Sequence, residues 1–254
     1  MSGELQERKP GDRHGTIAPD NTGLFPLKCE SSSVVDKLYG RTSGGRRNSI
    51  FRGLARLISR ALLRVSVSGA ENVPRSGGVL LCINHIGDAD AVVVVGFAPR
   101  PLAGIGKVEI LKWPLVGWIA QTYGMLAVHR GEPDRPTLRA ALDVLRAGGA
   151  VAIAPEGRES PTGALILAKD GAAFLALHSG VPIVPAALTG TAWKHILNEW
   201  RRLRRARVTL TFGPPLYLPP LINRKDATEL IMRRIASLLP PEFRGAYREA
   251  DPTA

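Results

Sequence analysis

The fold is decided by one stretch of the sequence, VLLCINHIGDADAVVVVGF at residues 79–97. It opens with an apolar run, residues 79–83, whose length and composition are typical of a strand buried on both faces. Residues 88–97 are predicted to form a helix. A buried strand followed at once by a helix predicts an α/β domain with polar residues 84–90 at the carboxyl end of the strand. In such folds, ligands bind at these strand ends.

Similar alternation continues on both sides of this stretch, and no internal repeat is visible. We expect one α/β layered domain with a mostly buried mixed sheet flanked by helices, at residues 65–241. Before it we expect a disordered or loosely attached arm (1–48) and a basic helix (49–64), and after it a tail (242–254). The further strands are predicted at 65–68, 125–128, 151–154, 183–188 and 208–212, and the further helices at 136–147, 170–178 and 226–239. An Asp226–Glu229 pair resembles a reciprocal cap at the start of the last helix.

The net charge of +12 comes from two segments. Residues 37–70 contain eight basic and no acidic residues, and residues 194–207 contain six basic residues and Glu199. Their partner should therefore be anionic. A nucleic-acid-binding module is one interpretation, but aromatic residues make up only 6% of the chain and the basic residues lie away from the polar strand end. We expect no specific nucleic-acid partner.

The basic helix at residues 49–64 is amphipathic. Its apolar residues recur at helical spacing, and its arginines fall four apart, at Arg52, Arg56, Arg60 and Arg64. One interpretation is that these arginines bind an anionic membrane surface. The other is that the apolar face packs on the domain and the arginines lie in water. Residues 201–207, beside Trp193 and Trp200, are either part of a membrane-interface belt or a solvated loop.

Targeting and redox features are few. Residues 1–15 lack the basic and apolar regions of a secretory signal, so none is predicted. The uncharged window at 171–193 is interrupted by Pro182 and Pro185 and is predicted to be helix, turn and strand rather than a transmembrane helix. Two cysteines, Cys29 and Cys82, are too few for a disulfide framework or a cysteine-rich metal site. A reducing cytoplasm fits best, and no metal is expected.

The polar strand end places His85 five residues before Asp90, with Gly87 between them. A turn through Gly87 would let the Asp90 carboxylate fold back onto the imidazole. A carboxylate on one ring nitrogen fixes the tautomer, so the other nitrogen can remove a proton from a hydroxyl group. The alternative is an ordinary helix start, where acidic residues suit the helix dipole and the histidine is a polar loop residue.

Three further segments resemble parts of such a site, although each has an ordinary structural interpretation. GMLAVHR at 124–130 ends an apolar strand with Arg130, which by itself is more typical of a surface residue. PEGRES at 155–160 follows the strand at 151–154 and could be a simple polar turn. VPIVP at 181–185 is typical of entry into a buried strand.

In this order and at these distances, the four segments resemble those of the glycerolipid acyltransferase family. The resemblance covers residues 65–218 and includes Lys107, followed by Glu109, Pro114 and Gly117. It implies that residues 65–241 are a catalytic domain in which His85 is the base and Asp90 its orienting partner. It also implies that the acceptor and its phosphate are bound by a set of residues near the base: Asn84, Lys107, Arg130, Glu156, Gly157 and Arg158.

Two positions depart from the family pattern. The family commonly has Glu-Gly-Thr-Arg-Ser in its third segment, and here Arg158 and Glu159 replace Thr-Arg. Either Arg158 reaches the same phosphate from a neighbouring position, or the acceptor is recognised differently. The second departure is Gly87, where the family often has serine.

The resemblance implies transfer of a fatty acyl group from acyl-CoA or acyl carrier protein to a hydroxyl of a phosphate-bearing glycerolipid, with 1-acylglycerol-3-phosphate as the expected acceptor. No cofactor is expected beyond this co-substrate. No Gly-x-Ser-x-Gly motif is present, so direct attack by the acceptor is favoured over an acyl-enzyme. Another lysolipid or polar lipid acceptor, hydrolysis of the thioester, and a catalytically silent membrane-binding relative are the alternatives. We expect peripheral attachment to the cytoplasmic side of a membrane; the oligomeric state is left open.

Overall fold

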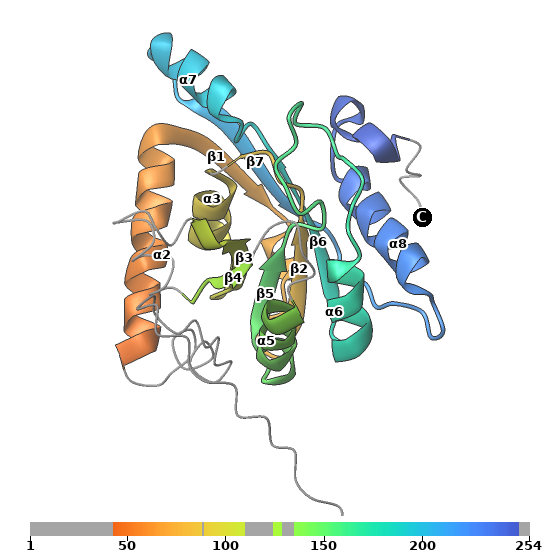
Figure 1. Cartoon of the computed structure of the whole chain (residues 1–254). Coiled ribbons are helices and arrows are strands. Elements are labelled where there is room, and N and C mark those ends of the chain that lie inside the picture. The colour runs from red at the N-terminus through yellow and green to blue at the C-terminus, as the bar shows by residue number, and fades with distance from the viewer. Residues whose placement is uncertain (1–42, 88, 110–123, 129–134, 249–254) are drawn as a thin grey trace, which may run out of the picture.

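A seven-stranded sheet forms the centre of the molecule (Figure 1). The computed structural model describes residues 43–87, 89–109, 124–128 and 135–248. The strand order is β1-β7-β6-β2-β5-β3-β4, and every neighbouring pair is parallel except β6 with β7. The strands are β1 (Leu63–Ser68), β2 (Val79–Ile83), β3 (Ala103–Lys107), β4 (Leu126–Val128), β5 (Ala150–Ile153), β6 (Ile183–Thr189) and β7 (Ala206–Phe212).

Helices cover both faces of this sheet. Their bounds are α2 (Ser43–Leu62), α3 (Ala89–Phe97), α5 (Arg135–Arg146), α6 (Gly171–Ser179), α7 (Trp193–Arg201) and α8 (Arg224–Ser237). Short 3-10 turns lie at η1 (Ala70–Asn72), η3 (Pro241–Phe243) and η4 (Gly245–Tyr247). Helices α5, α6 and α8 lie on one side of the sheet, and α3 lies on the other side, with α2 outside it (Figure 1). The chain therefore has the predicted α/β layered architecture.

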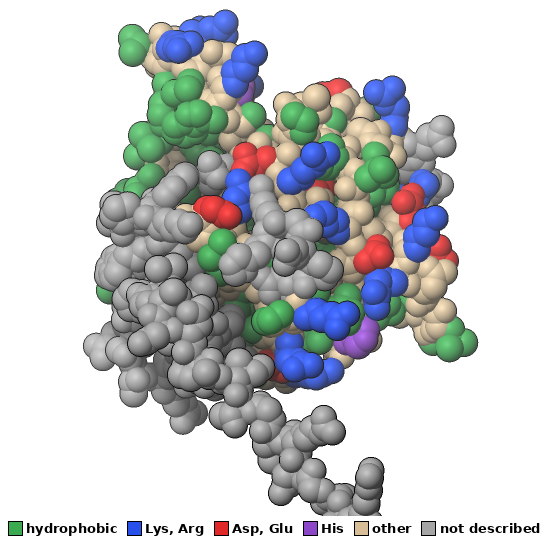
Figure 2. Space-filling model, in the orientation of Figure 1, with side chains coloured by type: hydrophobic (Ala, Val, Ile, Leu, Met, Phe, Trp, Pro, Cys, Tyr) green, Lys and Arg blue, Asp and Glu red, His purple; other side chains and the backbone are tan. Residues whose placement is uncertain are grey.

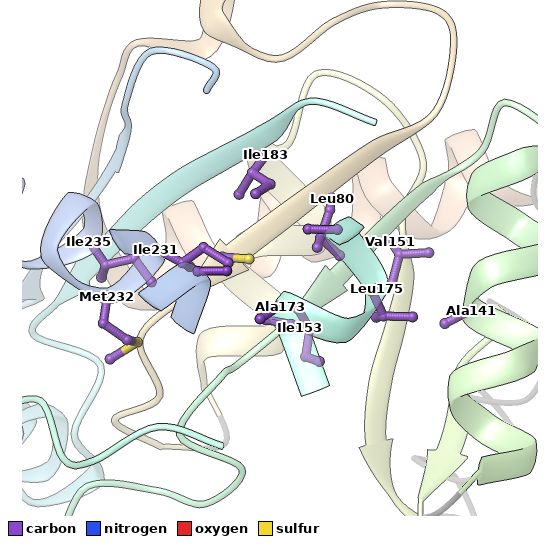
Figure 3. Close-up of a cluster of buried hydrophobic side chains, with 14 of the residues drawn as sticks. Leu80, Ala141, Val151, Ile153, Ala173, Leu175, Ile183, Ile231, Met232 and Ile235 are labelled. Atoms are coloured by element: carbon purple, nitrogen blue, oxygen red, sulfur yellow. The ribbon is translucent and has the colours of Figure 1, made fainter. Parts of the chain in front are cut away.

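Two buried clusters fill the spaces between these layers, because successive side chains of a strand point to opposite faces. In β2, Leu80 and Cys82 join the cluster under α5, α6 and α8, while Leu81 and Ile83 join the cluster toward α3 and α7. Figure 3 shows the first cluster, in which Leu80 lies near side chains from β5 and β6 and from the covering helices. A strand buried on both faces explains why the run at residues 79–83 is continuously apolar.

The predicted strands are all present, with ends that differ by one or two residues. The sequence analysis missed β3 and α7. The β3 segment, Ala-Gly-Ile-Gly-Lys, contains two glycines, which are unfavourable in strands. The apolar residues of α7 (Trp193, Ile196, Leu197 and Trp200) recur at helical spacing, a signal in the sequence that was not used. Of the basic residues 201–207, Arg201 ends α7, residues 202–205 form an exposed turn, and β7 begins at Ala206.

Three predicted boundaries are corrected. Helix α2 begins at Ser43 and Asn48 is buried, so the expected arm does not extend to residue 48. Residues 242–248 are not a free tail, because Tyr247 is buried and its hydroxyl accepts a hydrogen bond from the Ala168 amide at 3.2 Å. Helix α8 is capped by Asn223, whose side chain accepts a hydrogen bond from the Asp226 amide, and not by Asp226 itself.

The arginines of α2 are oriented differently from either prediction. The Arg56 Nε donates to the Gly96 carbonyl at 2.9 Å, and Arg52 donates to the Ala98 carbonyl. Gly96 lies in the last turn of α3 and Ala98 directly follows the helix, where acceptors are left unpaired and positive charge is stabilising. A Cβ on Gly96 would meet the α2 backbone at 3.0–3.2 Å, so the glycine permits this close approach. Helix α2 therefore caps α3 with Arg52 and Arg56, whereas Arg64, which was predicted on the same helix, lies in β1.

Candidate active site

Three adjacent parallel strands bring the predicted site residues together. His85 follows β2, the segment 155–160 follows β5, and Lys107 is the last residue of β3. Strand β5 lies between β2 and β3, and all three run in the same direction. Their carboxyl ends therefore meet at one edge of the sheet, where α/β folds place their ligands.

The predicted His85–Asp90 pair is formed. The imidazole Nδ1 lies 2.9 Å from Asp90 Oδ2. The same oxygen accepts hydrogen bonds from the amides of Ile86 at 2.7 Å and Gly87 at 3.1 Å. The Asp90 side chain is 3% exposed, whereas the His85 side chain is 21% exposed. The turn through Gly87 thus fixes the carboxylate on Nδ1 and leaves the other side of the imidazole accessible.

Glu156 supports the backbone of this turn and does not face an acceptor. Its Oε1 accepts from the His85 amide at 2.9 Å, and its Oε2 accepts from the Ile166 amide at 3.0 Å. The side chain is buried. Burial raises the pKa of the Glu156 carboxyl, although the two amide hydrogen bonds partly oppose this effect. The expectation that Glu156 contacts the acceptor is therefore corrected, and its role is to position His85.

Asn84 is also structural. Its side-chain amide donates to the Leu188 carbonyl at 2.9 Å, and its side-chain oxygen accepts from the Leu188 amide at 2.7 Å. The residue is buried, and both of these hydrogen bonds go to the backbone of β6. Asn84 therefore fixes the end of β2 against β6 and is not placed to bind an acceptor, contrary to expectation.

Two exposed cationic side chains, Arg158 and Lys169, lie at the turn after β5. Gly157 has a left-handed φ of 68°, a conformation that few other residues adopt. The Lys169 side chain lies over this glycine, 3.2 Å from where a Cβ would be. Arg158 is exposed beside it. Sequence reasoning missed Lys169, because its proximity depends on how the loop 161–170 returns to the turn.

Lys107 and Glu159 form an ion pair next to the imidazole. The Lys107 Nζ lies 3.0 Å from Glu159 Oε1, and the same oxygen lies 3.9 Å from His85 Nε2. The two side chains are 28% and 34% exposed. The sequence analysis expected Lys107 near a phosphate and noted Glu159 only as a departure from the family pattern. The meeting of strand ends at one edge could have indicated their proximity.

Other candidates contribute less. Arg130 lies outside the described residues. Cys82 is fully buried within β2, and burial raises the pKa of its thiol, so it is not available as a nucleophile. Within the described parts of the chain, no group of three or more histidine, cysteine and carboxylate side chains is arranged to hold a metal ion.

Together these groups place an imidazole oriented by a carboxylate beside cationic side chains. An imidazole oriented by a carboxylate can accept a proton at Nε2, and the nearby lysine and arginine side chains can attract an anion. Ser160 is buried and its amide donates to the His85 carbonyl at 2.8 Å, but its hydroxyl donates to the Ala164 carbonyl rather than to the imidazole. The arrangement is thus suited to activating a hydroxyl group of a bound, anionic substrate.

The family is identified by comparison with known proteins. The Acyltransferase family model matches residues 64–189, which include both His85 and the turn after β5. The chain belongs to the glycerolipid acyltransferase family, as the motifs predicted.

Two relatives are both named 1-acyl-sn-glycerol-3-phosphate acyltransferase. The chain is 30% identical over 187 residues to a 1-acyl-sn-glycerol-3-phosphate acyltransferase of Limnanthes douglasii, covering 72% of this chain and 61% of the relative. It is 26% identical to the enzyme of that name from Bacillus subtilis, covering 68% and 87%. The chain spans 54–61% of the length of the first plant and algal relatives it matches.

A solved structure has the same fold. The crystal structure of the 1-acyl-sn-glycerophosphate (LPA) acyltransferase PlsC from Thermotoga maritima matches with a TM-score of 0.58 at 23% identity. The match covers 81% of this chain and 92% of that chain.

Proposed function

We propose that this chain transfers a fatty acyl group from acyl-CoA or acyl carrier protein to the free hydroxyl of 1-acylglycerol-3-phosphate, giving phosphatidic acid. The observation that carries the proposal is the 2.9 Å contact between His85 Nδ1 and Asp90, with Nε2 on the accessible side of the ring. Family membership supports the reaction class, and the names of the relatives support this acceptor.

The mechanism follows from the orientation of the imidazole. His85 Nε2 takes the proton of the acceptor hydroxyl while its oxygen forms a bond to the thioester carbonyl carbon. The tetrahedral intermediate then collapses, the carbon–sulfur bond breaks, and the thiolate leaves with the proton from the imidazolium. Asp90 stabilises the imidazolium through Nδ1. Because thiolates leave readily and Cys82 is buried, no acyl-enzyme is needed.

The acceptor phosphate is held by the cationic groups around the turn after β5. Lys107 is nearest to the base, and Arg158 and Lys169 are exposed beside the turn. Binding the phosphate places the adjacent hydroxyl near Nε2, and such orientation can contribute up to about 7–11 kcal/mol to catalysis.

The test is to incubate the purified protein with acyl-CoA and 1-acylglycerol-3-phosphate and to measure phosphatidic acid by mass spectrometry. We expect turnover that falls roughly 10²–10⁴-fold in His85→Ala. The matched control is His178→Ala, an exposed histidine on α6, which should retain full activity. Full activity of His85→Ala would contradict the proposal.

Product analysis separates two alternatives. Hydrolysis of the thioester would release free fatty acid in place of phosphatidic acid, and a catalytically silent relative would release neither. An acyl-enzyme at Cys82 predicts loss of activity in Cys82→Ala, whereas direct transfer predicts that this variant retains it.

We also propose that the protein binds peripherally to the cytoplasmic side of an anionic membrane through the outer surface of α2 and α7. Because the arginines of α2 point toward α3, its exposed face is apolar, comprising Ile50, Leu54, Leu57, Ile58 and Leu62. Trp200 on α7 donates to the Leu62 carbonyl at 3.0 Å, so the two helices lie together. Figure 2 shows hydrophobic side chains on this side of the molecule, next to basic ones.

This surface combines the two features that bind membranes. Apolar side chains can enter the headgroup region, and nearby basic residues of 201–205 would each contribute about 1 kcal/mol on an anionic leaflet. Within the described residues, no helix is sufficiently long and apolar to span a bilayer.

Vesicle sedimentation tests this binding. We expect the protein to bind vesicles containing phosphatidylglycerol, and Leu57→Glu to weaken binding by roughly tenfold, since a leucine side chain contributes about 1.5–3 kcal/mol when buried. The control is Leu221→Glu, a fully exposed leucine before α8 on the other side of the sheet. Equal losses in both variants would contradict the assignment of the surface to α2.

A further inference from the structure

Glu159 occupies the position where the proposed acceptor must bind. Its Oε1 pairs with Lys107 Nζ at 3.0 Å and lies 3.9 Å from His85 Nε2, the atom that would take the hydroxyl proton. A carboxylate is therefore located between the base and the nearest cation, in a site for a negatively charged substrate.

The sequence context makes this placement more unexpected. The usual family pattern has threonine and arginine where this chain has Arg158 and Glu159, so these two positions together carry one positive charge fewer here and the negative charge lies at position 159. In the structure, the charge of Lys107 is balanced by a residue of the chain itself.

We propose that Glu159 is a specificity-determining residue that competes with the acceptor phosphate for Lys107. The acceptor phosphate replaces the Glu159 carboxylate on the lysine, and this exchange moves the carboxylate away from Nε2. This inference rests on the proposed function, because it concerns the same acceptor and the same base.

Charge and exposure favour the exchange. The Lys107–Glu159 pair is about one-third exposed, so water weakens it. Glu159 follows β5 in a segment that is neither helix nor strand. A phosphate monoester carries about −1.5 to −2 charges at pH 7, more than a carboxylate, and it offers more acceptor oxygens. The phosphate therefore binds the lysine more strongly than Glu159 does.

The geometry fits one acceptor molecule. Glu159 Oε1 lies near both Lys107 Nζ and His85 Nε2, so the lysine and the imidazole are close to each other. In 1-acylglycerol-3-phosphate the free hydroxyl and the phosphate ester are on neighbouring carbons, so one molecule can place its phosphate on Lys107 and its hydroxyl at Nε2. An acceptor without phosphate has no group that displaces Glu159, and it is therefore disfavoured.

Substitution of Glu159 separates competition from a direct catalytic role. Glu159→Gln removes the charge at nearly constant shape, and we expect KM for 1-acylglycerol-3-phosphate to fall roughly fivefold with little change in kcat. Glu159→Arg, which introduces the usual family residue, should lower KM further. In a Lys107→Ala background, Glu159→Gln should no longer lower KM, because the competition concerns that lysine.

A matched control tests for a general charge effect. Glu109 is exposed two residues beyond Lys107, and Glu109→Gln changes the net charge equally. We expect its KM to equal that of the unmodified protein. The proposal is overturned by an unchanged or raised KM in Glu159→Gln, by an equal effect of Glu109→Gln, or by a fall in KM that persists without Lys107. Equal turnover of 1-acylglycerol and its 3-phosphate by the unmodified protein would overturn it too.

Binding of sn-glycerol 3-phosphate distinguishes this proposal from the proposed function. Calorimetry measures its affinity without any turnover. Tighter binding to Glu159→Gln than to the unmodified protein supports the competition even if no phosphatidic acid is formed, and equal or weaker binding contradicts it. Absence of acyl transfer by the unmodified protein contradicts only the proposed function.

Discussion

Two pairs of charged residues surround His85, and they are held in different ways. Asp90 and Glu156 are buried, and their oxygens accept hydrogen bonds from backbone amides. Lys107 and Glu159 are about one-third exposed and pair through their flexible side chains. Hydrogen bonds to buried charged groups are strong and difficult to replace, whereas exposed ion pairs contribute little. The buried acids therefore fix the orientation of the imidazole, whereas the exposed ion pair costs less to exchange for another partner.

The largest effect is expected from Asp90→Asn. The amide nitrogen of asparagine cannot accept the hydrogen bonds that Asp90 Oδ2 accepts, and it no longer stabilises the imidazolium. We expect kcat to fall about 10²–10⁴-fold in the acyl-transfer assay. Asp226→Asn changes an exposed acid in the first turn of α8 and should leave kcat unchanged. Similar kcat values for the two variants would remove the distinction between buried and exposed acids.

Replacing Glu156 or Glu159 with glutamine compares how much the buried acid and the exposed acid contribute to the free energy of unfolding. Glu156→Gln leaves one of two buried amides without its acceptor, so we expect a loss of about 1–3 kcal/mol in the free energy of unfolding, measured with urea. Glu159→Gln should change this free energy by less than about 0.5 kcal/mol, because its ion pair is exposed. Stability losses of equal size would show that Glu159 is structural as well.

A smaller effect concerns pH. The raised pKa of Glu156 means that the folded protein binds more protons than the unfolded chain just above the ordinary carboxyl range. Its contribution to stability is thus present at low pH and is lost as pH rises through the raised pKa. We expect the difference in unfolding free energy between the unmodified protein and Glu156→Gln to shrink across this window. A difference that grows with pH would contradict the raised pKa.

The smallest effect is the response to salt. Screening weakens exposed charge interactions more than buried ones. We expect KM for 1-acylglycerol-3-phosphate to rise modestly between low and physiological salt, with little change in kcat. A fall in kcat without a change in KM would indicate that salt acts on the buried pair.

The sequence predicted the features that depend on local pattern. The strand at 79–83, the helix after it and the His85–Asp90 pair follow from apolar periodicity and the spacing around Gly87. Glu156 and Asn84 were expected to bind an acceptor, but they bind backbone groups from distant segments. Such contacts are not visible in a single sequence, because polar residue types serve both purposes.

The arginines of α2 illustrate the same limit. Their four-residue spacing correctly predicted one helix face for Arg52, Arg56 and Arg60 but not for Arg64, which lies in β1, and it did not predict which face is turned toward the domain. Orientation depended on the unpaired carbonyls at the end of α3, a partner that periodicity cannot identify. Strand β3 was missed for a related reason. Its two glycines give it a low intrinsic preference for strand structure, and it pairs with the neighbouring strands β4 and β5.

The arginine contacts between α2 and α3 join two parts of the molecule with different tasks. Helix α3 carries Asp90 in its first turn, and its last turn is held by Arg52 and Arg56. Any force that a lipid surface exerts on α2 thus reaches the helix that orients the His85 imidazole. A chain truncated to begin at Leu63 should consequently lose activity even toward short-chain, water-soluble acceptors, and unimpaired turnover of these would show that the two helices work independently.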